Sequence, residues 1–245
     1  MFFGTLYCPV ISQFTHFKTL RGVCIMLEKL LKILRQHQAD PKRFFTIVRA
    51  NFAYASPGMR LIEEAYEIAN SAHLGQLRET GEDYIEHPKM TAVILLEYLG
   101  ITDPGEIAAA LNHDTPEDHP EEWPITRIHE RLSREVAENV DWCNRRRFDY
   151  IEDRRARDLA FFNNLLMVAP LRPVRIKLAD QLHNCLTPWR LDDANWILKK
   201  CGDIREHYIP MAHKHGGVLG HELAAAADAL EARQCLLPPI KKGSL

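Results

Sequence analysis

The sequence predicts an all-α protein that folds as a helical bundle. Apolar residues recur at helical spacing in most segments, whereas the alternation typical of strands is sparse. Proline marks several breaks between these segments, as at Pro57, Pro116 and Pro170. Of the 245 residues, 46% are hydrophobic, which is enough for one sizeable core.

The expected helices follow one another with short breaks. The first covers residues 26–36, with Leu27, Leu30, Leu31 and Leu34 on one side. The others are expected at 61–73, from Pro88 to Gly100, from Asp103 to Thr115, and at 125–142, 158–169, 174–187, 193–214 and 221–235. A break near Ser133 is expected inside 125–142, because serine favours helix starts.

We divide the chain into three parts. Residues 1–55 are predicted to be an N-terminal extension with a short helix, and Ser56-Pro57-Gly58 breaks the chain before the main domain. Residues 56–236 form that domain, and residues 237–245 form a tail expected to be disordered.

Charge and cysteine content exclude several protein classes. The formal net charge is −2, so nothing predicts bulk attraction to nucleic acid or to a membrane surface. No apolar run approaches the roughly 18 residues of a membrane span. The six cysteines form no C-x-x-C pair, which favours a reducing cytoplasm. We therefore expect a cytoplasmic protein, and a homo-oligomer remains open.

The segment that ends at His113-Asp114 carries the first candidate for chemistry. Asp103 and Glu106 form a capping box around Pro104, and Pro116 should end the helix at Thr115. Asp114 continues the apolar face of this helix, so its carboxylate should point inward and require a partner or a metal ion. The alternative is a helix-terminal pair that bonds to local backbone.

A second candidate lies on the helix expected at 174–187. Lys177, Asp180 and Asn184 share one face, whereas Leu178 and Leu182 lie on another that should belong to the core. A small polar site needs such converging groups, although a solvated face with a Lys-Asp pair is the alternative.

The sequence offers one set of metal ligands from three helices. His73 closes a helix with an otherwise apolar inner side, and it joins His113, Asp114 and Asp180. Alone, His73 fits a core or capping histidine equally well. Mixed imidazole and carboxylate ligation suits Mn²⁺, Fe²⁺ or Zn²⁺.

Three further residues are expected beside this metal. Glu117 and Asp118 follow the Pro116 break, where paired carboxylates can orient water and move a proton. Arg78 lies in the polar loop after His73, and a guanidinium can stack on a base or hold phosphate. The alternatives are an acidic surface turn and a solvated arginine.

Four ordered motifs resemble the hydrolase domain of the RelA/SpoT family. Residues 73–88, HLGQLRETGEDYIEHP, match its H-x-G-Q-x-R-x-[ST]-G-x-x-Y-I-x-H-P stretch, and residues 113–118, HDTPED, match its HD-x-x-ED. Residues 177–184, KLADQLHN, resemble its K-L-A-D-x-L-H-N, and residues 208–213, YIPMAH, resemble its Y-A-P-L-A-H. The similarity covers about residues 60–216.

The resemblance implies an all-helical HD domain, a metal-dependent phosphohydrolase that cleaves (p)ppGpp to GDP or GTP plus pyrophosphate with Mn²⁺. Matching motif positions imply that His73, His113, Asp114 and Asp180 bind the metal and that Glu117 and Asp118 are catalytic. Arg78, Lys177, Asn184 and Tyr208 are implied to bind the nucleotide. Because only about 30 residues follow the last motif, the chain resembles a stand-alone small alarmone hydrolase.

The chain departs from the family pattern mainly at residues 143–157. The arginines there include Arg145, Arg146, Arg147, Arg154 and Arg155, which match none of the four motifs. Substrate choice is therefore less constrained than metal binding. A phosphohydrolase for ppApp, NADPH or another nucleotide is one alternative, and a non-catalytic, metal-bearing regulatory module is another.

Overall fold

The computed structural model describes residues 26–188 and 192–232. Within these ranges the chain is helical and forms no β-strand, and one isolated antiparallel bridge joins Leu77 to Asp83. The predicted all-α class is confirmed. Residues 1–25 of the predicted N-terminal extension and the predicted disordered tail at 237–245 lie outside the described residues.

Short turns connect the helices. Residues 26–39 form the first helix, and the others are α2 (Arg43–Asn51), α3 (Pro57–Ala72), α4 (Glu86–Val93), the π-helical η1 (Ile94–Tyr98), α5 (Pro104–Leu111), α6 (Thr115–Asp118), α7 (Ile125–Arg131), α8 (Arg134–Cys143), the 3₁₀ turn η2 (Arg145–Phe148), α9 (Arg154–Met167), α10 (Leu171–Leu186), α11 (Ala194–Asp203), the π-helical η3 (Ile204–Tyr208), α12 (Ile209–Lys214) and α13 (Gly220–Glu231). No helix in the described part of the chain is long and apolar enough to cross a membrane.

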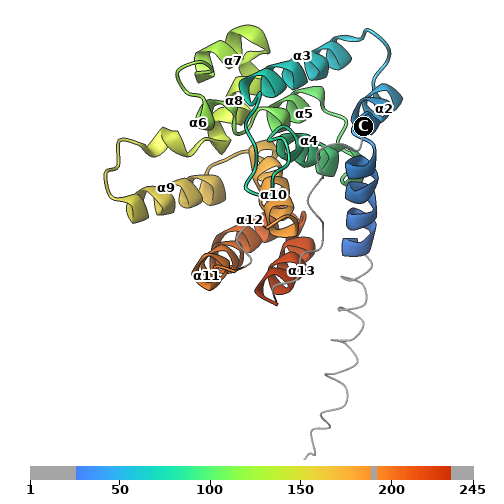
Figure 1. Cartoon of the computed structure of the whole chain (residues 1–245). Helices are drawn as coiled ribbons and strands as arrows, with labels where there is room; N and C mark the ends of the chain where they lie inside the picture. Colours follow the sequence, from blue (N-terminus) through green and yellow to red (C-terminus); the bar gives the residue numbers. More distant parts are fainter. Residues whose placement is uncertain (1–25, 189–191, 233–245) are drawn as a thin grey trace, which may run out of the picture.

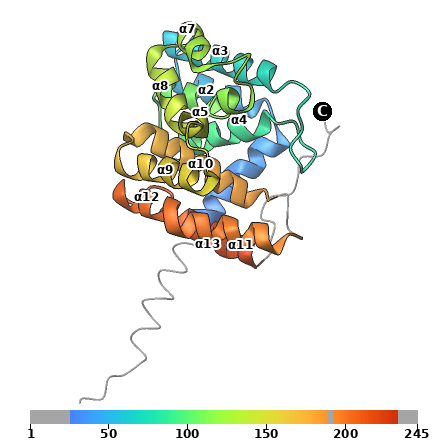
Figure 2. The same ribbon diagram turned by 90° about the vertical axis from the view of Figure 1, so that its left-hand side faces the viewer.

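Helix α10 runs through the middle of the molecule (Figure 1). It contacts α4, α5 and α8 on one side and α9, α12 and α13 on the other. Figure 2 shows α3, α5, α7 and α8 above α10 and α11–α13 below it. The predicted core face is confirmed, because Leu178 and Leu182 are fully buried. Because helices also cover the other face of α10, its polar side chains Lys177 and Asp180 are buried as well.

Residues 26–55, which we predicted as part of an extension, pack against the main domain. Leu30, Leu34, Phe44 and Val48 are fully buried and belong to the same hydrophobic core as α3–α5 and α10. His37 Nε2 lies 2.6 Å from a carboxylate oxygen of Glu97. Burial of the helix at 26–39 thus contributes to the stability of the whole bundle.

The capping predictions around α5 are partly correct. The Asp103 side chain accepts a hydrogen bond from the Glu106 amide, as expected for an N-cap. The Glu106 carboxylate does not reach back to residue 103 but pairs with Arg175 of α10, its Oε1 2.8 Å from Arg175 Nε. Helix α5 ends at Leu111, earlier than predicted, and His113 follows in a turn. This turn aims His113 at α10.

Candidate metal centre and active-site pocket

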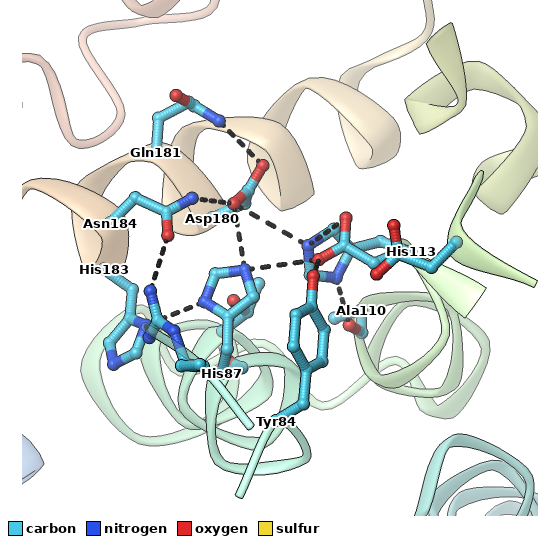
Figure 3. A network of polar contacts seen from close by, with 12 residues as sticks. Tyr84, His87, Ala110, His113, Asp180, Gln181, His183 and Asn184 are labelled. Atoms are coloured by element: carbon cyan, nitrogen blue, oxygen red, sulfur yellow. Dashed lines mark hydrogen bonds and ion pairs between the residues drawn. The ribbon is translucent and has the colours of Figure 1, made fainter. Parts of the chain in front are cut away.

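Three buried side chains bring their ligand atoms together between α4, α5 and α10. His87, His113 and Asp180 each offer one atom, and all three atoms lie within 4.8 Å of one another. His87 Nε2 is 3.1 Å from Asp180 Oδ1, and His113 Nε2 is 3.7 Å from the same oxygen. Asp114 joins this group, with Oδ1 3.2 Å from His113 Nε2 and Oδ2 3.5 Å from His87 Nε2. Figure 3 shows the two imidazoles converging on Asp180.

Outer hydrogen bonds orient both imidazoles of this cluster. His113 Nδ1 lies 2.8 Å from the Ala110 carbonyl oxygen, so Nδ1 carries a hydrogen and donates it to that oxygen. His87 Nδ1 lies 2.8 Å from His183 Nδ1. Burial, with Arg78 and His87 nearby, holds the pKa of His183 well below its usual range, so His183 is the neutral acceptor. Each Nε2 is thereby directed toward the carboxylates.

The surroundings of the cluster keep its carboxylates ionised. Burial raises the pKa of Asp180, but Lys177 and the histidines His113 and His87 outweigh this effect and hold it well below its usual range. Lys177 Nζ lies 2.6 Å from Asp180 Oδ2. Burial lowers the pKa of His113, yet the carboxylates of Asp114 and Asp180 raise it to about 10. A cation at this point would replace that proton as the counter-charge.

The donor set fits a divalent cation. Two imidazole nitrogens and two carboxylates form a mixed N/O environment without thiolates. His113 Nε2 is buried and makes no hydrogen bond of acceptable geometry to any described residue. A buried polar atom without a partner is costly, and a metal ion would satisfy it.

His73, which we predicted as a ligand, is not among the converging atoms. It caps the end of α3, and its Nδ1 lies 2.7 Å from Gln76 Oε1. Its ring stacks on Tyr84 at 4.4 Å between centroids, and the Tyr84 hydroxyl donates to Asp114 Oδ2 at 3.0 Å. His73 therefore approaches the cluster through Tyr84, while His87 supplies the imidazole that we had expected from His73.

The loop between α3 and α4 folds back over the cluster. Gly75 and Gly81 have φ of 80° and 88°, conformations that other residues rarely adopt, and they let the chain reverse twice. The Arg78 amide donates to the Glu82 carbonyl at 2.9 Å, which closes the second turn. This fold presents His87, at the start of α4, to α10.

Arg78 is buried and bonded to other side chains of the protein. Its guanidinium donates to Glu82 Oε1 at 3.1 Å and to Asn184 Oδ1 at 2.9 Å, and it contacts Thr187 and His183. Because His183 in turn accepts from His87, Arg78 connects the loop to a ligand of the cluster. We expected this residue to contact the base; the structure shows that it bonds to side chains of α10.

Glu117 and Asp118 lie beside the cluster on the short helix α6. Glu117 Oε2 accepts from the Arg145 amide at 3.2 Å, and Gln76 Nε2 donates to Asp118 Oδ2 at 3.5 Å. Burial raises the pKa of Glu117 above its ordinary value, although Lys177 opposes this shift. A carboxyl group with a raised pKa is suited to exchange a proton near neutral pH.

A cavity of about 420 Å³ opens onto these groups. Its wall includes Arg78, Lys177 and Asn184 of the predicted substrate residues, together with both α6 carboxylates and Asp180. Asn184 Nδ2 donates to Asp180 Oδ1 at 2.7 Å, so the predicted shared face of α10 is present. Tyr208 does not line this cavity: it is buried in η3, and its hydroxyl lies 3.5 Å from Arg145 NH2.

Sequence reasoning missed several residues of the site. His87 and Tyr84 belong to the first motif. Their i, i+3 spacing before Pro88 could have indicated that both side chains lie on the same side of the chain. His183 and Gln181 were visible in the third motif, but nothing in their spacing distinguished them from core or surface residues. Arg145 lies outside all four motifs, and only its packing against α6 reveals its position.

An all-α fold with a buried His-Asp cluster beside an acidic pair defines a metal-binding helical domain of the HD type. A family model described as HD domain matches residues 65–216, and the chain belongs to this family. These bounds agree with the stretch of about residues 60–216 that we expected from the motifs.

Curated relatives support the predicted resemblance to the RelA/SpoT hydrolase domain. The chain is 33% identical over 193 residues to a GTP pyrophosphokinase of Streptomyces coelicolor, covering 78% of this chain and 20% of that protein. It is 32% identical over 163 residues to the bifunctional (p)ppGpp synthase/hydrolase SpoT of Escherichia coli, covering 64% and 22%. It is 35% identical over 153 residues to a guanosine-3′,5′-bis(diphosphate) 3′-pyrophosphohydrolase of Haemophilus influenzae, covering 61% and 22%. The chain thus spans about a fifth of the length of these relatives.

A solved structure shares the fold. It is described as a metazoan ortholog of SpoT that hydrolyzes ppGpp, and it superposes with a TM-score of 0.50 at 22% identity. The alignment covers 76% of this chain and all of that one. At this identity the likeness confirms the all-α HD fold.

Proposed function

We propose that this protein hydrolyses the 3′-pyrophosphate bond of (p)ppGpp, giving GDP or GTP and pyrophosphate. One observation carries the proposal: the buried His87–His113–Asp180 cluster shares a cavity with the carboxylates of Glu117 and Asp118. The relatives named as (p)ppGpp hydrolases support it. We further propose that the protein acts in the cytoplasm.

The proposed metal ligands are His87, His113, Asp114 and Asp180, and the proposed ion is Mn²⁺. Oxygen-rich ligation with two imidazoles suits Mn²⁺, and it also admits Fe²⁺ or Zn²⁺. When bound, the ion supplies Lewis acidity and neutralises negative charge on the phosphate oxygens. Lys177, which lies 2.6 Å from Asp180, adds positive charge to the same wall of the cavity.

Glu117 and Asp118 are the proposed proton-handling pair. Both line the cavity from α6, and the raised pKa of Glu117 places its titration closer to neutrality. We propose that Glu117 takes a proton from the attacking water as a general base. Asp118, held by Gln76, orients that water.

Asn184 and Arg78 are proposed to hold the nucleotide. Both line the cavity and are joined by a hydrogen bond of 2.9 Å, so the loop and α10 form one rigid wall. Tyr208 is proposed to act through Arg145, since its hydroxyl lies behind that guanidinium and outside the cavity wall. A rigid wall positions the substrate without an entropy cost at the moment of reaction.

A second candidate is hydrolysis of another nucleotide, such as ppApp or NADPH. The observation that favours it is the state of Arg78, whose guanidinium is bonded to Glu82 and Asn184. Because these bonds occupy N–H groups of the guanidinium, the flat face of the group is left to stack on a base. Stacking distinguishes one base from another poorly.

A substrate panel tests the proposal. The full chain is incubated with Mn²⁺ and ppGpp, pppGpp, ppApp or NADPH, and released pyrophosphate and orthophosphate are quantified separately. We expect pyrophosphate from the guanosine alarmones at the highest kcat/KM. Release of orthophosphate alone, or a clear preference for NADPH, would transfer the assignment to the second candidate. An Asp180→Asn variant is the control, because removing a ligand should abolish turnover of every substrate.

A further inference from the structure

A second cavity, of about 660 Å³, adjoins the metal cluster. Five cationic side chains line it together with four carboxylates and one aromatic ring: Arg145, Arg146, Arg154, Arg157, Lys199, Glu117, Asp118, Asp149, Asp158 and Phe161. Its cations come from η2, α9 and α11. Below, we call this space the arginine cavity.

The arginine cavity is continuous with the reaction site. Glu117, Asp118 and Arg145 line both cavities, so a single ligand can reach from one into the other. Arg145 is fixed at this junction: its NH1 lies 2.9 Å from Asp158 Oδ1, and its guanidinium carbon lies 4.7 Å from the Phe161 ring centroid. The junction thus has a positive group in a defined position.

Inside the arginine cavity, two guanidinium groups converge on one carboxylate. Arg157 NH1 lies 3.1 Å from Asp149 Oδ1, and Arg146 NH1 lies 3.8 Å from Asp149 Oδ2. The Asp149 side chain is about half exposed, at 49%, and exposed ion pairs are weak. A phosphate group carries more charge and accepts bidentate hydrogen bonds from guanidinium, so it can compete with Asp149 for these donors.

Arg154 offers further positive charge to the same cavity. Among residues 26–188 and 192–232 it makes no hydrogen bond or ion pair, and its side chain is exposed. Lys199 Nζ is 2.9 Å from Asp203 Oδ2, a carboxylate outside the cavity lining. Arg154 can therefore bind an anion without losing a contact to a described residue, whereas Arg146 and Arg157 would exchange their contacts with Asp149 for the anion.

We propose that the arginine cavity is the subsite for the phosphate groups of the substrate that are not hydrolysed. The inference rests on the proposed function, because ppGpp carries a diphosphate on each of its 3′ and 5′ oxygens. With the 3′-pyrophosphate at the metal cluster, the 5′-diphosphate needs a cationic site within one nucleotide's reach. The arginine cavity offers five cationic side chains against four carboxylates, and it shares part of its wall with the reaction site. It therefore favours nucleotides that carry a 5′-phosphate.

The test compares ppGpp with guanosine 3′-diphosphate, which lacks the 5′-phosphates. We measure kcat/KM for both nucleotides with Mn²⁺, in the wild type and in an Arg154→Ala/Arg157→Ala variant. The wild type should prefer ppGpp, and the variant should lose this preference on the order of tenfold, as expected for two exposed charge contacts. The matched control is Arg131→Ala/Arg134→Ala, which removes the same charge from α7 and α8. There the two arginines form exposed ion pairs with Glu64 of α3 and Glu138 of α8. This control should keep the wild-type preference.

Each outcome bears on one of the two proposals. Equal loss of preference in both double variants would show a general charge effect and overturn the subsite, as would an unchanged preference in the Arg154/Arg157 variant. If the wild type cleaves neither nucleotide, the proposed function fails, and equilibrium binding of GDP then decides the subsite. Weaker GDP binding in the Arg154/Arg157 variant than in the control supports the anion site, and equal binding overturns it. Circular dichroism of both variants verifies that the helices are intact.

Discussion

The metal cluster and the arginine cavity lie side by side, but their side chains are held in opposite ways. Arg78, at the cluster, is 7% exposed and contacts four other side chains. Arg157, in the arginine cavity, makes one ion pair with the half-exposed Asp149. The first region has geometry that is fixed before any ligand binds, as chemistry requires, and the second has cations that can rearrange around an anion. The comparison predicts large, local effects from changes at the cluster and small, charge-dependent effects from changes in the cavity.

The largest effect is a loss of Mn²⁺ affinity, which we expect when His87 is replaced but not when His73 is replaced. His87→Ala should lower Mn²⁺ affinity by more than about a hundredfold, since changes outside the ligand set already cost about 10- to 100-fold. His73→Ala should retain Mn²⁺ binding, because His73 is not among the converging ligand atoms and its Nδ1 lies 2.7 Å from Gln76 Oε1. Isothermal titration of the metal-free proteins measures both.

The His73→Ala variant is also the matched control, because it removes one buried imidazole at the other end of the loop between α3 and α4. If the two variants lost Mn²⁺ to the same extent, the assignment of His87 as a ligand in place of His73 would be wrong.

These histidines also show how far the sequence could predict the site. His113, Asp114 and Asp180 were proposed as ligands because a helical face and a buried charge can be recognised in the sequence, and the structure brings these side chains together. The choice between His73 and His87 depends on two loop reversals at Gly75 and Gly81, and periodicity carries no information about such a loop. The helix order was predicted well for the same reason that the loop was not: helices repeat locally, whereas the packing of a loop depends on residues far away in the chain.

The second-largest effect is expected from Glu117, the proposed general base that takes a proton from the attacking water. Glu117→Gln should retain Mn²⁺ and reduce kcat by about 10²- to 10⁴-fold, because it removes the general base without touching a ligand. A base must be deprotonated to act, so wild-type kcat should fall as the pH drops through the Glu117 pKa. Burial raises that pKa above the ordinary 4.5, so the acidic limb of the profile should lie above this pH.

A pH profile of kcat for the wild type and for Glu117→Gln checks this assignment. The variant should lack the acidic limb in its remaining activity. Retention of that limb would assign it to another group, and parallel loss of Mn²⁺ binding would show that Glu117 belongs to the ligand set.

Arg78 tests whether the fixed network at the cluster matters for the metal. Arg78→Ala should weaken Mn²⁺ binding by about 10- to 100-fold, because Arg78 contacts His183, which orients His87. It should also raise KM for ppGpp, since it joins Asn184 to the loop. Arg78→Lys should not restore either property, because an ammonium cannot bond to both Glu82 and Asn184 with the geometry of a guanidinium.

Metal titration without nucleotide separates the two roles of Arg78. Normal Mn²⁺ affinity combined with a raised KM would restrict Arg78 to nucleotide binding. The contrast between the cluster and the arginine cavity would then be smaller than the structure indicates.

The smallest effect is expected in the arginine cavity, and it depends on salt. An exposed ion pair is worth at most about 1 kcal/mol, so Arg157→Ala should raise KM for ppGpp by a factor of about five or less. Salt screens exposed charges, so wild-type KM should rise as ionic strength increases, and the variant should respond less steeply. Because Arg157 bonds only to a half-exposed carboxylate, the thermal midpoint should stay within a few degrees of the wild type. Steady-state kinetics over a range of salt concentrations, with Arg134→Ala as the control of equal charge, measures this difference. A salt response in Arg157→Ala as steep as that of the control would mean that the cavity arginines do not contact the substrate, and only the cluster would then remain as a binding region.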